Sequence, residues 1–412
     1  MNKLFYFFVL FIIPLSYYIK SIEILYVIGM TYSYIILFLA NKHPIKKRVV
    51  NNRSIVIFFF FMISTIISNM YFYLIDSESA KTYFSPYARM WFYFFEFTIA
   101  FTLINNRKKL EKLIKLIIFS SIIPNIIGLL QIKLDIFTIV MSKEGARRIG
   151  STMAHPNFYG YFLVIVLICI LYKATNVVGK NKSLLFLCHF YAFFTLFLLY
   201  NTNSRTTFFL GVIIYLINIY FDLKKYLNSK QLKYLRASLL TVFFLLFMGL
   251  IAYFYFNNTF TNTRYNFVEN SGSFAWRVMK WKTALSYWFE DPFAVLIGFG
   301  WMSSFVFTTN ELYSNYAMHN EYVRILFETG ILGFSLYIIF LCIVFQNIKN
   351  IKDWKLKKFF FSVYFLFLIG SLTGNLLGVP ENTTYFFILF AVTINHNYFR
   401  EVESNNEGIT HN

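Results

Sequence analysis

Long apolar stretches, separated by short polar connections, run through almost the whole chain. Each stretch is apolar on all sides, which favours helices over the strands of a membrane barrel, because barrel strands alternate with period two. A hydrocarbon layer of about 30 Å requires about 20 such residues in a helix. Twelve stretches fit: Leu4–Ile19, Ile22–Ala40, Ile55–Ile75, Ala88–Ile104, Leu113–Ile132, Phe158–Tyr172, Leu184–Tyr200, Thr207–Phe221, Ala237–Phe256, Tyr322–Phe345, Phe359–Leu377 and Thr383–Phe399. The pattern predicts an all-α polytopic integral membrane protein with about 12 transmembrane helices.

The apolar pattern stops for about 65 residues between Asn257 and Glu321, a segment rich in Gly, Asn, Ser and Trp. We therefore expect three parts. Residues 1–256 carry helices 1 to 9, residues 257–321 form one large extracytoplasmic loop, and residues 322–412 carry helices 10 to 12 and a cytoplasmic tail. The density of Trp and Tyr over 274–289 predicts an interfacial helix, so we expect the loop to press onto the membrane and act as a lid.

Composition and charge agree with this class. Hydrophobic residues make up 58% of the chain and charged residues only 14%, which excludes an ordinary soluble domain. With twelve spans and a cytoplasmic N-terminus, the inner segments hold 25 of the 38 Lys and Arg residues. This is the bias of the positive-inside rule, and it predicts that both termini are cytoplasmic. The net charge of +19 is then explained by the membrane, without a nucleic-acid partner.

The basic residues also differ in kind between the two faces. Inside, 20 of the 25 are Lys, whereas 7 of the 13 outside are Arg: Arg89, Arg147, Arg148, Arg205, Arg264, Arg277 and Arg324. Arginine binds phosphate oxygens through two parallel hydrogen bonds, whereas lysine is a hydrated point charge. Some outer arginines can simply pair with outer acids. As a set, they favour an external site for a phosphorylated lipid.

Several other kinds of site are disfavoured. Cys169, Cys188 and Cys342 all fall in apolar stretches, and no metal-ligand spacing or nucleotide-binding glycine loop occurs. We therefore expect neither a metal nor a cofactor. Glu96 and Glu328 are the clearest ionisable residues within spans, and both are expected where a span meets water. Ion-coupled transporters usually need more charge inside the membrane than this.

Four outer segments combine residues suited to chemistry. Residues 145–157 place Arg147, Arg148 and His155 before a span, where Pro156 disfavours helix at His155 and Asn157 is a candidate helix cap. Residues 201–207 form a tight connection whose one charge is Arg205. Residues 274–289 put Arg277, Trp281, Ala284 and Trp288 on one side of a helix. Residues 318–333 hold His319, an imidazole able to exchange protons, with Gly330 and Gly333 expected to allow close helix packing.

Together these residues resemble the O-antigen polymerase and ligase family of bacterial envelope polysaccharide assembly. The resemblance covers order and spacing over roughly 145–335, whereas the first third of the chain matches in hydropathy alone. The residues that carry it are Arg148-x-Gly150, Pro156-Asn157, Ser204-Arg205, Arg277-x-x-x-Trp281, Asp291-Pro292, Gly298-x-Gly300, His319-Asn320, Tyr322, Glu328, Gly330 and Gly333.

The resemblance implies a metal-independent glycosyltransferase of the bacterial cytoplasmic (inner) membrane, with its active site on the extracytoplasmic face. Its substrate would be a polyprenyl-diphosphate-linked oligosaccharide, such as an undecaprenyl diphosphate sugar. Carried over by position, Arg205 and Arg277 would bind the diphosphate, with Arg147 and Arg148 as further contacts. His319 would act as base, or orienting group, for the attacking hydroxyl. Membrane lipid, chain-length regulators and flippases would be its partners.

Two activities fit this family. A polymerase transfers the glycan to another lipid-linked repeat unit of an O-antigen, capsule or exopolysaccharide, whereas a ligase transfers it to lipid A–core. We favour the polymerase. A flippase or other transporter of lipid-linked oligosaccharides is the alternative of another class, and it would line a central cavity with cationic residues. A structural partner in an assembly complex is a third interpretation.

Overall fold

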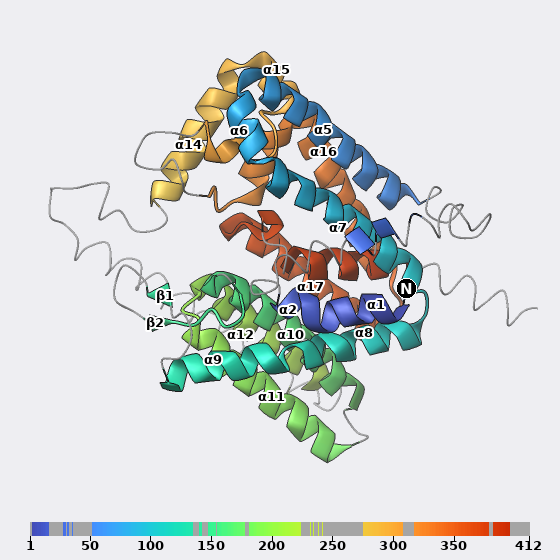
Figure 1. The fold of residues 1–412 in the computed structure, drawn as a ribbon. Coiled ribbons are helices and arrows are strands. Elements are labelled where there is room, and N and C mark those ends of the chain that lie inside the picture. The colour runs from blue at the N-terminus through green and yellow to red at the C-terminus, as the bar shows by residue number, and fades with distance from the viewer. Residues whose placement is uncertain are drawn as a thin grey trace, which may run out of the picture.

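The computed structural model is built almost entirely of helices (Figure 1). The residues that it describes are 2–15, 28–29, 31–32, 35, 52–134, 140–141, 147–153, 155–177, 181–223, 231, 234, 238, 241, 275–307, 317–378 and 382–395. Within them, the non-helical regular structure is one two-stranded antiparallel hairpin.

Seven helices of the described residues are long and apolar enough to cross a membrane. They are α5 (Arg53–Ile75), α8 and α9 taken together (Arg107–Leu134), α10 (Pro156–Val177), α11 (Lys182–Asn201), α12 (Arg205–Leu223), α16 (Glu321–Asn350) and α17 (Trp354–Thr373). Each contains one of the predicted spans, although α17 ends four residues before the predicted limit of its span. An integral membrane protein is therefore confirmed, whereas the count of twelve stays a prediction.

The other predicted spans have different outcomes. The span predicted over 88–104 lies in α7 (Phe84–Leu103) except for its last residue, and α7 is not among the seven. The first and last spans correspond to shorter apolar helices over Asn2–Leu15, labelled α1, η1 and α2, and over Asn382–Asn395. The spans predicted over 22–40 and 237–256 lie almost wholly outside the described residues.

The helices form two groups with α17 between them (Figure 1). In one group α16 packs on α5 and on the short helix α15 (Pro292–Ile297), with α6 (Ser77–Thr82), α7 and α14 (Ala275–Glu290) nearby. In the other group α10 packs against α8, α11 and α12. Both α10 and α16 also contact α17, so α17 connects the two groups.

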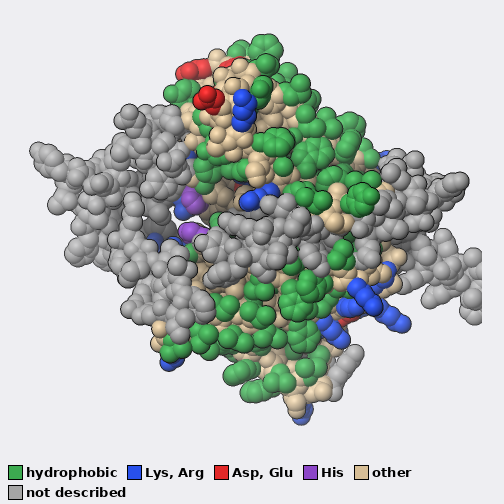
Figure 2. Space-filling model, in the orientation of Figure 1, with side chains coloured by type: hydrophobic (Ala, Val, Ile, Leu, Met, Phe, Trp, Pro, Cys, Tyr) green, Lys and Arg blue, Asp and Glu red, His purple; other side chains and the backbone are tan. Residues whose placement is uncertain are grey.

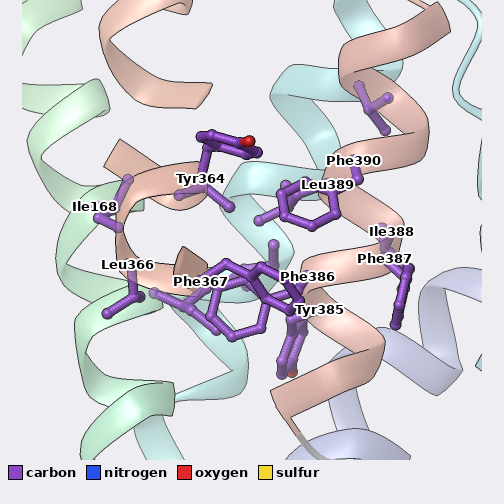
Figure 3. Close-up of a cluster of buried hydrophobic side chains, with 14 of the residues drawn as sticks. Ile168, Tyr364, Leu366, Phe367, Tyr385, Phe386, Phe387, Ile388, Leu389 and Phe390 are labelled. Atoms are coloured by element: carbon purple, nitrogen blue, oxygen red, sulfur yellow. The ribbon is translucent and has the colours of Figure 1, made fainter. Parts of the chain in front are cut away.

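Aromatic packing holds the C-terminal helix Asn382–Asn395 against α17 (Figure 3). The Phe367 ring lies 5.1 Å from the ring centroids of both Phe386 and Phe390. Such pairs contribute about 0.5–1.5 kcal/mol each beyond the area that they bury. This interface fixes the position of α17 and of residues 374–378, which follow it.

Helix α16 is broken at Gly330, whose φ of 64° and ψ of −172° are not helical. The backbone N–H groups of Phe299 and Gly300 donate to the carbonyl oxygens of Phe327 and Glu328, at 3.0 and 2.9 Å. These bonds satisfy polar groups that water does not reach inside a membrane protein. The expected close helix contact at Gly330 is confirmed, because an added Cβ atom there would lie 2.4 Å from the carbonyl oxygen of Leu296 in α15.

Candidate functional site

Arg277 lies near the start of α14 and reaches the C-terminal end of α17. Its Nη1 atom donates to the carbonyl oxygen of Thr373 at 3.3 Å. Burial lowers the pKa of Arg277 from its usual value, yet a guanidinium remains charged at any physiological pH. The structure thus holds a partly buried cation where α14 meets the end of α17.

Lys280 lies one turn further along α14 and was not predicted. Only 1% of its surface is exposed, and burial lowers its pKa to about 8, opposed by the charge of Glu328. Its position three residues after Arg277 places both cations on neighbouring positions of one helix face. This spacing could have indicated Lys280 in the sequence. It was missed because Lys280 looks like any other basic residue of a polar segment.

Three tryptophans of residues 275–307 contact the rest of the protein, and two of them are buried. Trp281 Nε1 donates to the Met318 carbonyl oxygen at 2.6 Å, and Trp288 Nε1 donates to the Ala294 carbonyl oxygen at 2.8 Å. Trp288 and Trp301 are only 3% and 2% exposed. Membrane anchoring is therefore the wrong interpretation for these two, although the predicted one-sided face of α14 is confirmed.

His319 is held in an unusual backbone conformation directly before α16. Its φ of 52° is left-handed, which costs a non-glycine residue on the order of 1–3 kcal/mol and occurs mainly at functional sites. Its backbone N–H donates to Asn375 Oδ1 at 2.8 Å. The next residue, Asn320, caps α16 by accepting from the N–H groups of Tyr322 and Val323. The imidazole is thus fixed by its neighbours on both sides.

Cations surround the His319 ring. Burial lowers its pKa to about 3, and the positive charges of Arg277, His155 and Lys280 act in the same direction. His319 is consequently neutral at physiological pH. The interaction with His155 also shows that the loop before α10 lies close to His319.

The segment before α10 presents Arg148 from the small hairpin of β1 (Val140–Met141) and β2 (Arg147–Arg148). Arg148 Nε donates to the Thr202 carbonyl oxygen at 3.1 Å, and its Nη2 donates to Asn157 Oδ1 at 2.8 Å. Arg148 is therefore held between α10 and the connection that precedes α12. The side chain of Arg147 lies outside the described part of the chain.

Arg205 begins α12 and is exposed. Burial lowers the pKa of Arg148, and the charge of Arg205 lowers it further, so the two guanidinium groups lie close together. Arg148 in turn contributes to the lowered pKa of His155, which burial brings to about 4. The predicted cap by Asn157 is wrong, because His155 Nδ1 instead accepts from the Asn157 N–H at 3.1 Å.

Electrostatic contacts therefore connect the predicted residues into one region. They run from Arg205 to Arg148, from Arg148 to His155, from His155 to His319, and from His319 to Arg277. Figure 2 shows histidine surface beside Lys and Arg surface in the middle of the face it presents, with broad hydrophobic areas above and below. This arrangement can hold an anion next to a neutral imidazole.

Three ionisable residues have roles other than those expected. Arg324 is 1% exposed and pairs with Glu321 at 2.6 Å, so it is not an exposed phosphate ligand. Glu328 and Glu96 are likewise buried rather than at a water boundary. Glu328 accepts from Ser304 Oγ at 2.5 Å, and Glu96 accepts from Thr384 Oγ1. Glu328 thus joins α16 to the segment after α15, and Glu96 joins α7 to the helix Asn382–Asn395.

The segment after α17 is the element that the sequence interpretation missed. Thr373 contacts Arg277, and Asn375 contacts His319. The polar sequence Thr373-Gly374-Asn375 inside a predicted span was the one available signal. In the described residues, no three His, Cys, Asp or Glu side chains gather as metal ligands.

Comparison with known proteins gives one match. No curated protein matches the chain. A family model described as O-antigen ligase matches residues 190–338, a segment that contains Arg205, Arg277 and His319. The match supports the resemblance to the O-antigen polymerase and ligase family over residues 190–338.

Proposed function

We propose that this protein is a polysaccharide polymerase of the bacterial cytoplasmic membrane. Members of its family are glycosyltransferase-like enzymes that act on lipid-linked sugars. The proposed donor is a glycan on a polyprenyl diphosphate, and the acceptor is a hydroxyl of another lipid-linked repeat unit. The site lies on the outer face, with both termini in the cytoplasm and residues 257–321 as the outer loop.

The observation that carries this proposal is the meeting of Arg277, Arg148 and Arg205 around two neutral histidines. In the reaction, the acceptor hydroxyl oxygen forms a bond to the anomeric carbon while the bond from that carbon to the diphosphate oxygen breaks. The leaving diphosphate takes the electron pair and gains charge, and the hydroxyl proton passes to His319 if the imidazole is the base, or to the departing diphosphate if the imidazole only orients the hydroxyl. Cations that are already in position stabilise such charge more effectively than water, which must first reorient.

The arginines divide between the two sides of this region. Arg277 comes from the loop side, whereas Arg205 and Arg148 come from the connections beside α10 and α12. A diphosphate bound between them receives hydrogen bonds from two directions, which fixes its orientation relative to the sugar. We assign Arg277 and Arg205 as the principal ligands and Arg148 and Arg147 as further contacts.

His319 is the partner of the acceptor hydroxyl, as its base or its orienting group. The pKa of about 3 keeps the ring neutral, so the ring can hydrogen-bond the hydroxyl, but it also makes the ring a weak proton acceptor and so favours the orienting role. Arg277 lies near enough to His319 to lower its pKa, so a hydroxyl at the imidazole would lie close to the diphosphate at the guanidinium. That proximity is what transfer between two lipid-linked substrates requires.

The test uses Arg277→Ala, Arg205→Ala and His319→Ala proteins, purified in nanodiscs with lipid-linked repeat units. We expect each substitution to reduce polymer formation by about 100-fold, the usual effect of losing one group that stabilises transition-state charge or transfers a proton. Arg89→Ala is the matched control, because Arg89 is an outer arginine on α7, away from these contacts.

The outcomes separate the interpretations. Normal polymer lengths in all three variants refute the enzymatic proposal. Movement of single repeat units across the bilayer without polymer would indicate a flippase, and transfer to lipid A–core would indicate a ligase. The same assay in excess chelator tests metal independence, and we expect unchanged polymer. Loss of polymer in chelator, restored by a divalent cation, contradicts it.

A further inference from the structure

One side-chain amide contacts both the backbone and the ring of His319. Asn375 Oδ1 accepts the His319 backbone N–H at 2.8 Å, and Asn375 Nδ2 lies 3.5 Å from His319 Nδ1. The two ends of an asparagine amide are assigned from their partners. A backbone N–H requires an acceptor, so the oxygen must face it, and the NH₂ group must then face the ring.

This orientation determines the hydrogen position on the imidazole. An NH₂ group is a donor alone, so it interacts favourably with a ring nitrogen that carries a lone pair. A neutral imidazole has one N–H, and if Nδ1 carries the lone pair, Nε2 carries the hydrogen. The positive charges of Arg277 and Lys280, together with burial, favour the neutral ring.

The segment that carries Asn375 is itself anchored. The Leu377 N–H donates to Glu321 Oε1 at 2.7 Å, and the Gly378 N–H donates to the Asn375 carbonyl oxygen at 3.2 Å. Glu321 is fixed in turn by its buried pair with Arg324. Glu321 is the first residue of α16, two residues after His319. Asn375 and His319 are therefore tied to the same helix end.

We propose that Asn375 is a positioning residue that holds the His319 ring as the tautomer with its hydrogen on Nε2. The inference rests on the proposed function for its chemical meaning. His319 then offers an Nε2–H donor to an oxygen of the substrate, which makes it an orienting group rather than a base acting through Nε2. Asn375 acts through His319 and touches no substrate in this scheme.

The direct test measures the tautomer in the full-length, substrate-free protein in nanodiscs. Histidine labelled with ¹⁵N distinguishes protonated from unprotonated ring nitrogens by NMR, and the difference spectrum against His319→Gln assigns the His319 signals. We expect an unprotonated Nδ1 and a protonated Nε2. A protonated Nδ1 in the unsubstituted protein overturns the proposal.

Asn375→Asp is the decisive variant, because it has nearly the same shape but offers acceptors alone. Its carboxylate can still accept the His319 backbone N–H, while its second oxygen requires a donor at Nδ1. We expect Nδ1 to become protonated in this variant, whereas Asn347→Asp, near the far end of α16, leaves the His319 signals unchanged. An unchanged His319 tautomer in folded Asn375→Asp protein contradicts the proposal.

Activity provides the second readout. We expect Asn375→Asp to lower polymer turnover about tenfold or more, the usual size of an effect on a group that orients a functional side chain. We also expect its pH profile to gain an acidic limb, because the carboxylate makes His319 titratable. Unchanged turnover in a variant whose tautomer has switched would show that the tautomer is irrelevant to the reaction.

Failure of this inference and failure of the proposed function are distinguishable. If His319→Ala protein makes normal polymer, the proposed function fails even when the tautomer is as described. If the unsubstituted protein has the other tautomer while Arg277→Ala and His319→Ala are inactive, the role of Asn375 fails and the proposed function stands.

Discussion

The polar surroundings of His319 show how a loop residue acquires a fixed chemical state. Its backbone is strained, its N–H is bound to Asn375, and the preceding carbonyl at Met318 is bound to Trp281. These contacts come from three separate parts of the chain. A side chain held in this way loses little further entropy when a substrate binds, which is the benefit of preorganisation.

The lowered pKa of His319 predicts how stability changes with pH. Its pKa is about 3 in the folded protein and near 6.5 when unfolded, so the unfolded state binds more protons between these values. Stability is therefore fully present above about pH 6.5 and falls as the pH drops towards the folded pKa. We expect the thermal midpoint to decrease between pH 7 and pH 5, and to decrease less in His319→Gln protein.

Thermal unfolding in detergent at matched ionic strength measures this effect. His155 contributes in the same direction, because burial and Arg148 lower its pKa to about 4. His155→Gln is therefore a second variant with a reduced slope. If the pH slopes of both variants equal that of the unsubstituted protein, the lowered pKa values are contradicted.

The sequence singled out Arg277 and His319 as side chains suited to chemistry in polar segments. The structure places the two close together, and their roles stay predictions. Arg324 was grouped with the candidate phosphate ligands because the sequence does not distinguish an arginine buried in a pair with Glu321 from an exposed one. Asn375 was missed because its role depends on a contact between residues 56 positions apart in the chain.

At the scale of elements, the break in α16 depends on two glycines whose backbones meet. A Cβ atom at Gly330 would lie 2.4 Å from the Leu296 carbonyl oxygen, and one at Gly298 would lie 2.3 Å from the Thr329 nitrogen. Both glycines also have positive φ, at 64° and 80°. Neither the space nor the backbone conformation tolerates a side chain.

Gly330→Ala is therefore expected to destabilise the protein by about 3 kcal/mol, from backbone strain and the displacement of α15. Thermal unfolding of the purified protein measures the loss, and a lower yield of folded protein accompanies it. Gly378→Ala is the matched control, because its nearest contact would be an ordinary 3.6 Å from Arg324 Nη1. Equal midpoints for the two variants would contradict the proposed constraint at the break.

Helices could be predicted well from the length of each apolar stretch, because a membrane span requires about 20 apolar residues. The break within α16 could not be predicted in this way. The break at Gly330 leaves the surrounding sequence as apolar as a continuous span, and Gly333 three residues later lies within regular helix. Gly333 instead permits the approach of α5, since an added Cβ atom would lie 2.9 Å from Ser64 Oγ.

At the scale of the whole molecule, the candidate site lies where the two groups of helices meet. Arg277 and His319 belong to the group that contains α14 and α16, whereas Arg148 and Arg205 belong to the group that contains α10 and α12. Helix α17 contacts both α10 and α16. Sequence alone predicted which loops take part, but it could not predict that the end of α17 joins them.

The orientation of the chain in the membrane is open to a direct test. In a background lacking the three native cysteines, Ser286→Cys on α14 and Lys352→Cys after α16 both introduce an exposed thiol. We expect a membrane-impermeant maleimide added to intact cells to label the first and not the second, because the charge bias places the 346–358 segment inside.

Labelling after permeabilisation controls for the reactivity of Lys352→Cys. Fluorescent reporters fused to the two termini test the remaining part of the topology, and both are expected to fold in the cytoplasm. If Lys352→Cys alone is labelled in intact cells, the chain has the opposite orientation, and the candidate site lies on the cytoplasmic face.

The hydrogen bonds from Phe299 and Gly300 to the broken turn of α16 have a consequence for biogenesis. Because the donors precede α16 in the chain, the ribosome delivers them before that helix reaches the bilayer. The carbonyl groups of the broken turn can therefore receive their hydrogen bonds as soon as α16 forms, before the later spans are made. In a chain lacking residues 298–300, α16 would instead insert with the carbonyl groups of Phe327 and Glu328 unpaired. We expect quality-control proteases to degrade such a chain.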